Sequence, residues 1–249
     1  FHENEVDNYK QDHYQFHWTQ SINSKIFSNL GLNLTKGEGY YEQYNENGNE
    51  DFITRKWLDN QFRVINYNLN YKGTKNDIIL GSTYSEYDGD HFGETIWAQN
   101  SGDIEFTDRF YNGRGLKKDF SNFFKSIFQV SKKINIYTDL QLRKISYITS
   151  GSTSNVSDLT VNKKYSFFNP KAGLNFQKDS KNRFYFSVAR AFREPTRSDF
   201  ENNIEIKPEE LIDYEMGWNY SDDKFYFNSN LYYMNYKNQL VLTGALDDV

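Results

Sequence analysis

The sequence predicts an all-β fold: an antiparallel transmembrane β-barrel, to which this chain contributes about ten strands. Three observations predict it. Apolar and polar residues alternate with a period of two along successive segments. The connections between these segments alternate between short and long. Aromatic residues make up 18% of the 249 residues, yet the mean hydropathy is −0.86, which suits strands that meet lipid on one face and water on the other.

Each alternating segment has one apolar and one polar face. In 213–220, the even-numbered residues are apolar or aromatic and the odd-numbered ones are polar or glycine. About ten residues at about 3.4 Å each, tilted by about 45°, span about 24 Å, the height of the apolar band of an outer-membrane barrel. We therefore expect strands of about ten residues. The predicted lipid-facing residues are Tyr14, Phe16, Trp18, Leu30, Leu32, Leu34, Ile65, Tyr67, Leu69, Tyr71, Phe120, Phe124, Phe128, Val130, Ile134, Ile136, Leu140, Leu142, Phe168, Ala172, Leu174, Phe176, Phe184, Phe186, Val188, Tyr214, Met216, Trp218 and Tyr220.

The connections favour a barrel over a soluble fold. The short ones span 72–76, 131–133, 178–182 and 221–224, and the long ones span 35–60, 89–117, 149–164 and 192–211. Outer-membrane barrels have short periplasmic turns and long extracellular loops. A soluble β-sandwich or β-helix, the alternative fold, has no reason to place every short turn at one end.

The polar face predicts a wide barrel. Its residues are mostly Asn, Gln, Asp, Lys, Arg, Ser and Gly. An open sheet of about ten strands would leave two unpaired edges in lipid, which is not tolerated. We therefore expect residues 1–249 to be a partial domain, an internal piece of a barrel of about 22 strands whose lumen holds a plug. The plug and the C-terminal strands are expected outside this sequence.

Composition and motifs exclude several function classes. The net charge of −5 is spread along the chain and argues against nucleic acid as a partner. No phosphate-binding glycine loop, nucleophile elbow or other catalytic constellation is present, so we expect neither an enzyme nor a cofactor. There is no Cys. His13 and His17 would stand about 13 Å apart along a strand, too far to share an ion, so no metal site is expected.

Two of the predicted loops carry candidate binding residues. In 35–60, Tyr40, Tyr41 and Tyr44 could stack on a sugar or an aromatic chelator, or could pack within their own loop. Loop 89–117 is acidic and could bind calcium or a cationic ligand, although a solvated acidic loop is the favoured interpretation. The acidic residues of this loop are Asp90, Glu94, Asp103, Glu105 and Asp108, and Asp88 directly precedes it.

The fourth long loop has opposite charges close together. Pro195 disfavours helix at Glu194, so the preceding strand should stop there. Arg193 and Arg197 lie near Glu194, Asp199 and Glu201 in the sequence. We expect these charges chiefly to pair with one another and shape the loop. Contacts of Arg193 and Arg197 with a plug or a ligand are the alternative.

Residues 183–240 resemble the barrels of TonB-dependent outer-membrane receptors. In that family a strand ends in an aromatic–Arg–x–Pro segment, followed by Lys-Pro-Glu and then by a Tyr-Glu-x-Gly strand. The matching residues here are Phe192, Arg193, Pro195, Lys207, Pro208, Glu209, Tyr214, Glu215 and Gly217, and the Tyr-rich strand 231–240 follows. The abundance of Asn, Lys and Tyr resembles members from the Bacteroidetes group.

The resemblance implies a function that the residues alone do not give. Such a receptor would lie in the outer membrane of a Gram-negative bacterium, surrounded by outer-membrane lipids. It would take up a scarce small-molecule or glycan ligand, such as a ferric siderophore, haem, cobalamin or a glycan. Transport would be driven by the TonB–ExbB–ExbD complex through a region N-terminal to Phe1. A passive porin or adhesin barrel, or a soluble carbohydrate-binding β-protein, are the alternatives.

Overall fold

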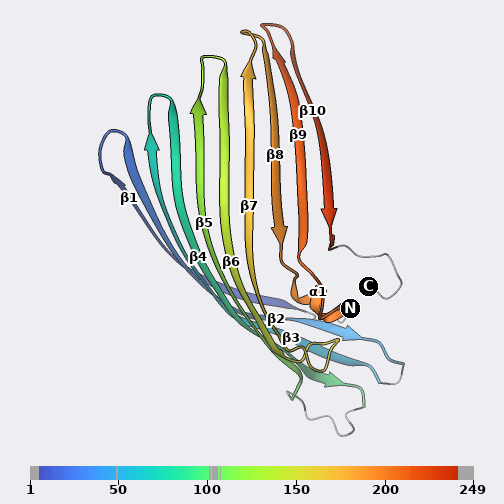
Figure 1. Cartoon of the computed structure of the whole chain (residues 1–249). Coiled ribbons are helices and arrows are strands. Elements are labelled where there is room, and N and C mark those ends of the chain that lie inside the picture. The colour runs from blue at the N-terminus through green and yellow to red at the C-terminus, as the bar shows by residue number, and fades with distance from the viewer. Residues whose placement is uncertain (1–5, 49, 101, 103–105, 107, 241–249) are drawn as a thin grey trace.

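The computed structural model describes residues 6–48, 50–100, 102, 106 and 108–240, and in them the chain forms one antiparallel sheet of ten strands in sequential order. Figure 1 shows a long, strongly curved sheet with one short helix on its concave side. The elements are β1 (Asp7–Ser21), β2 (Ile26–Asn45), β3 (Phe52–Lys72), β4 (Asn76–Ala98), β5 (Arg109–Gln129), β6 (Ile134–Gly151), β7 (Val161–Gln177), β8 (Asn182–Arg193), α1 (Arg197–Asn202), β9 (Glu209–Ser221) and β10 (Tyr226–Lys237).

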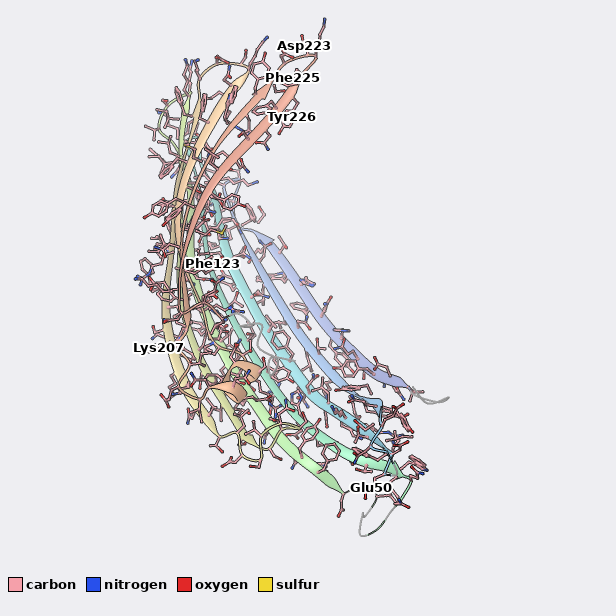
Figure 2. All side chains as sticks on the ribbon, turned by 90° about the vertical axis from the view of Figure 1, so that its right-hand side faces the viewer. Glu50, Phe123, Lys207, Asp223, Phe225 and Tyr226 are labelled. Carbon is pink, nitrogen blue, oxygen red and sulfur yellow. The ribbon has the colours of Figure 1, made fainter. Side chains whose placement is uncertain are left out.

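The short and long connections separate to opposite ends of the sheet, as predicted. Figure 2 shows Asp223, Phe225 and Tyr226 at the end with short turns and Glu50 at the other end. We name these the turn end and the loop end. The antiparallel all-β fold is therefore confirmed, and the ten strands form an open wall: the sheet order begins at β1 and finishes at β10.

The apolar face of the sheet has no second layer over it. Phe186, Met216 and Trp218 expose 49%, 53% and 40% of their surface. A β-sandwich would bury these side chains between two sheets. Their exposure fits a surface that meets hydrocarbon, so we call this the outer face. The opposite, inner face carries the polar residues and the connection between β8 and β9.

The strands are longer than the expected ten residues. β2, β3, β4 and β5 contain 20, 21, 23 and 21 residues. Most of the predicted loops 35–60 and 89–117 is therefore strand, and the two connections shorten to 46–51 and 99–108. Beyond the lipid band, both faces of the sheet meet water, so both carry polar residues and the apolar–polar alternation disappears from the sequence. The strands nevertheless continue there, because their backbone groups still pair with the neighbouring strands.

Aspartate side chains shape two of the short turns. Asp222 Oδ1 accepts hydrogen bonds from the backbone N–H groups of Lys224 and Phe225, at 3.0 and 2.8 Å. Asp179 Oδ1 accepts equivalent bonds from Lys181 and Asn182. Such side-chain bonds replace the backbone partners that a tight turn leaves unpaired. The bonds from Lys224, Tyr220 and Phe225 lower the pKa of Asp222 to about 2.

Candidate ligand-binding site

The connection between β8 and β9 folds back onto the inner face of the sheet. It contains α1, which Figure 1 places in the concavity near the loop end. Thr196 caps this helix: its hydroxyl accepts from the Asp199 N–H, and the Asp199 carboxylate accepts from the Thr196 N–H at 2.7 Å. Among the described residues, no helix is long and apolar enough to span a membrane.

An apolar contact holds α1 against the wall. Phe200 is only 1% exposed and packs with Leu159 and Val161, which lead from the preceding connection into β7. Its ring stacks on Tyr147 of β6 with 5.4 Å between centroids. This small core therefore fixes the helix over β6 and β7.

A buried carboxylate provides the second anchor of this connection. Glu194 is 7% exposed and accepts from Lys117 Nζ at 2.5 Å and from two Arg143 nitrogens at 2.8 and 2.9 Å. Arg143 also donates to Asp119 through Nε at 2.8 Å. Burial acts to raise the pKa of Glu194, but the bonds from Lys117 and Arg143 outweigh it, and the pKa lies below its ordinary value. The connection is thus pinned to β5 and β6 by a charged network.

Beside these anchors lies a group of aromatic hydroxyls that we call the tyrosine cluster: Tyr9, Tyr41, Tyr87, Tyr111 and Tyr147, with His91 and Arg197. Arg197 lies over these residues: a Cβ built on Gly113, the strand partner of His91, would lie 2.5 Å from Arg197 Nη2. The positive charge of Arg197 is therefore close enough to interact with Tyr87, His91, Tyr111 and Tyr147. Tyr87 Oη lies 3.1 Å from His91 Nε2. A hollow of about 290 Å³ is lined by Tyr9, Tyr41, Lys56, His91 and Tyr111, among others.

Arg197 itself is incompletely satisfied. Its Nη2 donates to the Ser152 carbonyl at 3.5 Å, and its Nε lies 3.9 Å from Glu201. The Nε is buried and has no hydrogen-bond acceptor. A buried guanidinium nitrogen without an acceptor is costly, and a ligand oxygen would relieve that cost. Together with phenol hydroxyls and Lys56, the cluster is suited to an oxygen-rich anion, and its rings could stack on a planar group.

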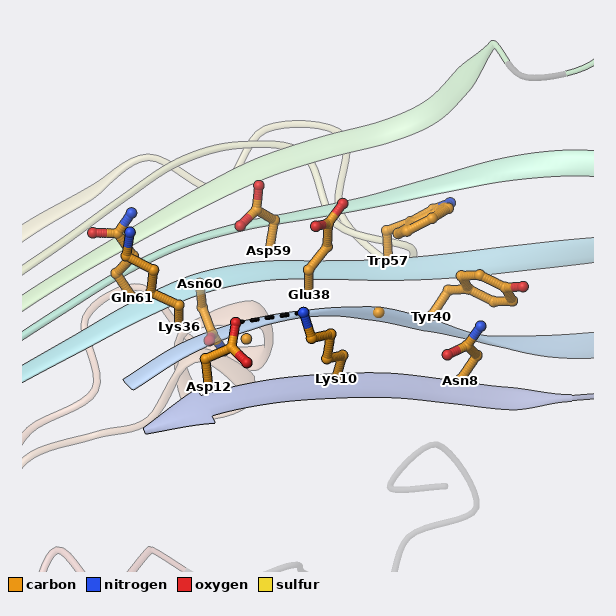
Figure 3. Close-up of a pocket in the computed structure, with 12 residues that line it drawn as sticks. Asn8, Lys10, Asp12, Lys36, Glu38, Tyr40, Trp57, Asp59, Asn60 and Gln61 are labelled. Atoms are coloured by element: carbon orange, nitrogen blue, oxygen red, sulfur yellow. Dashed lines mark ion pairs between the residues drawn. The ribbon is translucent and has the colours of Figure 1, made fainter. Parts of the chain in front are cut away.

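Of the five candidate contact residues, the structure brings Tyr41 and Arg197 together in this cluster and separates the other three. Tyr40 points from the outer face, because neighbouring strand residues face opposite sides. Its ring lies 4.6 Å from Trp57 and 4.1 Å from Arg55. Figure 3 shows Tyr40 and Trp57 beside the charged side chains of an outer-face hollow of about 330 Å³, in which Lys10 and Asp12 form an ion pair.

Tyr44 lies at the hairpin between β2 and β3. Its hydroxyl donates a short hydrogen bond to the Asp51 carboxylate. This bond and one from the Asn47 backbone N–H lower the pKa of Asp51. The prediction that the three tyrosines share one loop was therefore wrong: they lie on a strand, on two faces and at two levels.

Arg193 connects the ends of three neighbouring strands through its guanidinium group. Its Nη2 donates to the Leu240 carbonyl at 2.9 Å, and its Nε lies 3.5 Å from Glu209. Glu209 accepts from the Leu240 N–H at 2.9 Å, and the Pro208 carbonyl accepts from Asn238 at 3.4 Å. Arg193, Pro208 and Glu209 thus tie β8, β9 and the residues after β10 together.

The expected pairing among the loop charges holds only for Arg197 with Glu201. Glu194 binds the barrel wall, Asp199 caps α1, and Arg193 pairs with Glu209. Charges near one another in sequence were separated because this part of the chain turns back onto the sheet.

The other motif residues also have packing roles. Phe192 stacks on Phe167 at 5.1 Å, and Pro195 is fully buried. Tyr214 lies near Tyr233, with 6.4 Å between ring centroids, and the Glu215 carboxylate accepts from Ser187 at 3.5 Å.

Gly217 makes room for an aromatic ring. A Cβ at this position would lie 2.2 Å from the Tyr185 ring, whose hydroxyl donates to Asn230 at 2.8 Å. Only glycine lets the ring lie across the strand.

The acidic residues of 88–108 do not gather into a cation site in the described part of the chain. Asp88 accepts two hydrogen bonds from Arg114, and Asp90 lies 4.0 Å from the same guanidinium. Glu94 accepts from the Trp57 indole N–H at 3.1 Å. Asp103 and Glu105 lie outside the described residues, and Asp108 is exposed. Across the described ranges, no group of three or more His, Asp or Glu side chains could hold a metal ion.

Sequence reasoning missed Glu194, Lys117 and Arg143 as a unit, and it missed Tyr87, His91, Tyr111 and Tyr147. Two of these, Tyr87 and Arg143, carry a weak signal: each occupies the inward phase of its strand. The pairing of the strands places Lys117 of β5 opposite Tyr147 of β6. The sequence alone does not give this register.

Comparisons with known proteins agree with this architecture. A family model described as "TonB dependent receptor-like, beta-barrel" matches residues 2–249. No curated protein matches the sequence. Similar solved structures include the ferric-catecholate import receptor Fiu from E. coli K12 in its closed form (TM-score 0.70, 14% identity, 98% of this chain and 43% of that chain).

Two further structures share the fold. The siderophore receptor PiuA from Acinetobacter baumannii has a TM-score of 0.70 and 14% identity, over 92% of this chain and 40% of its own. The copper transporter OprC has a TM-score of 0.75 and 12% identity, over 91% of this chain and 38% of its own. This chain therefore spans about two-fifths of the length of the structures that it matches.

Proposed function

This chain belongs to the TonB-dependent receptor β-barrel family, and on that premise we propose that the whole protein is an outer-membrane uptake receptor that captures an anionic, oxygen-rich ligand at the tyrosine cluster. The family consists of outer-membrane transport receptors rather than enzymes. The loop end of the sheet then faces the outside of the cell, and the outer face meets outer-membrane lipids.

The observation that carries the ligand class is the buried Nε of Arg197, which has no acceptor. It stands among tyrosine hydroxyls on the inner face, where an incoming ligand would first meet the lumen. Metal chelates that present catecholate, carboxylate or similar oxygens have the complementary charge and can form several hydrogen bonds at once. The similar structures include the ferric-catecholate import receptor Fiu and the siderophore receptor PiuA, which supports the same class of ligand.

Active transport is the second part of the proposal. A plug, supplied by a part of the protein outside this sequence, would fill the polar lumen, and TonB with ExbB and ExbD would act on it. The lumen wall offers that plug many polar partners. A hollow of about 470 Å³ on the inner face is lined by Asp119, Lys125, Asp139, Gln141 and Arg143, among others.

The test uses the full-length protein and a panel of ferric catecholate, hydroxamate and citrate chelates. Arg197→Gln should weaken binding of the preferred chelate by about 10- to 100-fold, because one charge-assisted contact is worth about 1.5–3 kcal/mol. Arg114→Gln is the matched control: it removes the same charge at a similar level of the sheet but on the outer face. Equal affinities of both variants and the unmodified protein would reject the tyrosine cluster as the site.

Uptake in cells tests the coupling separately. Deletion of TonB should abolish import while surface binding persists. Import that continues unchanged without TonB would identify a passive barrel instead.

A further inference from the structure

Three lysines stand together on the outer face, at the loop-end border of the apolar band. They lie on three adjacent strands: Lys118 on β5, Lys144 on β6 and Lys164 on β7, and all are exposed. By the alternation of strand residues they share a face with the exposed apolar side chains nearer the turn end. Those side chains are Phe120, Leu142 and Phe168.

Strand register brings the three lysines into a triangle. Ser146 pairs with Lys118 on one side and with Lys164 on the other, so these two lysines lie at one level with Cα atoms about 10 Å apart. Lys144 lies on the strand between them, two residues nearer the turn end, about 7–8 Å diagonally from each. Four-carbon stems allow all three ammonium groups to reach one anion. Ser146 and Ser166, on the same face, add hydroxyl donors.

The triangle has a surplus of positive charge. Lys118 lies 3.5 Å from Glu86, but that carboxylate also pairs with Arg63 at 2.7 Å. In the described part of the chain, Lys144 and Lys164 form no ion pair. The outer-face hollow here measures about 390 Å³ and is lined by the three lysines, Tyr84 and Phe120, among others. Cations therefore ring a space that opens onto an apolar surface.

We propose that this lysine triangle binds the phosphate groups of a lipid headgroup in the outer leaflet, with the acyl chains of that lipid on the adjacent apolar band. The inference rests on the membrane placement given under the proposed function. A soluble phosphate would use the charge alone, whereas a lipid uses both the charge and the neighbouring Phe120, Leu142 and Phe168. Ammonium groups at a membrane surface attract anionic headgroups most strongly just outside the hydrocarbon.

The test measures lipid retention by the purified full-length protein in detergent, using native mass spectrometry. The probes are lipid A with two phosphates, the same lipid after removal of its phosphates, and inorganic phosphate. The triple variant Lys118→Gln/Lys144→Gln/Lys164→Gln should bind the diphosphorylated lipid about 100-fold more weakly, about fivefold per lysine. The difference should shrink in high salt. Removing the phosphates should weaken binding to the unmodified protein by a similar factor.

The control removes the same charge at the turn end: Lys75→Gln/Lys132→Gln/Lys178→Gln should retain the lipid. Equal retention by both triple variants, or equal binding of the phosphorylated and dephosphorylated lipid, overturns the proposal. Inorganic phosphate that binds as tightly as the lipid overturns the lipid assignment. The triple variant of the lysine triangle should bind chelates at the tyrosine cluster with unchanged affinity. The lipid proposal and the chelate proposal can therefore each be rejected without affecting the other.

Discussion

Glu194→Gln should detach the connection between β8 and β9 from the inner face without unfolding the sheet. The substitution removes a carboxylate that accepts from Lys117 and twice from Arg143. Breaking a buried ion pair costs about 3–5 kcal/mol when the partner is left uncompensated. Here the cost is smaller, because Arg143 keeps Asp119 and the Lys117 side chain is 36% exposed to water. We therefore expect a loss of about 2–3 kcal/mol in the free energy that holds this connection closed.

That loss corresponds to an increase of about 30- to 150-fold in the local opening constant. The assay is amide hydrogen exchange in the full-length protein, read for residues 197–206. The strand amides of β5 and β6 should exchange as before, since their ladder bonds do not involve Glu194. Because the pKa of Glu194 is lowered, its stabilising effect is present above the unfolded pKa and is lost as pH falls through the folded value.

Glu205→Gln is the control for this experiment. Glu205 lies in the same connection, but its side chain is 81% exposed and its nearest cation, Lys163, is 3.7 Å away. Exposed pairs of this kind contribute little. If exchange in 197–206 is the same in both variants, the ion network does not hold the connection, and the reasoning is refuted.

Three other substitutions test side-chain packing and one of the turns. Phe200→Ala should speed exchange of the same segment, since removing a buried Phe costs about 3–5 kcal/mol. Gly217→Ala should lower the Tm because its Cβ meets Tyr185, whereas Gly115→Ala, with the nearest atom at 3.9 Å, should not. Asp222→Ala should make the turn between β9 and β10 more mobile at pH 7, as measured by NMR relaxation of its backbone amides. In the unmodified protein, the Asp222 carboxylate should stabilise this turn above its unfolded pKa and should lose this effect as pH falls through about 2.

Period-two alternation was sufficient to predict the fold. Phe186, Met216 and Trp218 were assigned to the lipid face from their spacing, and the structure leaves all three exposed on one side of a single sheet. Turn positions were equally predictable, since Asp179 and Asp222 carry the side-chain chemistry of tight turns. Where water meets both faces the alternation fades, and there the strand ends were misplaced by about ten residues.

The sequence by itself determined that the chain is a lipid-facing antiparallel wall, because a two-solvent surface imposes its pattern residue by residue. The motif near Pro195 also pointed to the receptor family. Only the tertiary structure decided which polar residues meet. Glu194 reaches Arg143 across 51 residues, and Tyr41 reaches the cluster around Arg197, because strand register and the inward fold of one connection set those distances. The structure also decided that Tyr40 and Tyr41 lie on a strand, since β2 runs through both. Their side chains therefore point to opposite faces of the sheet.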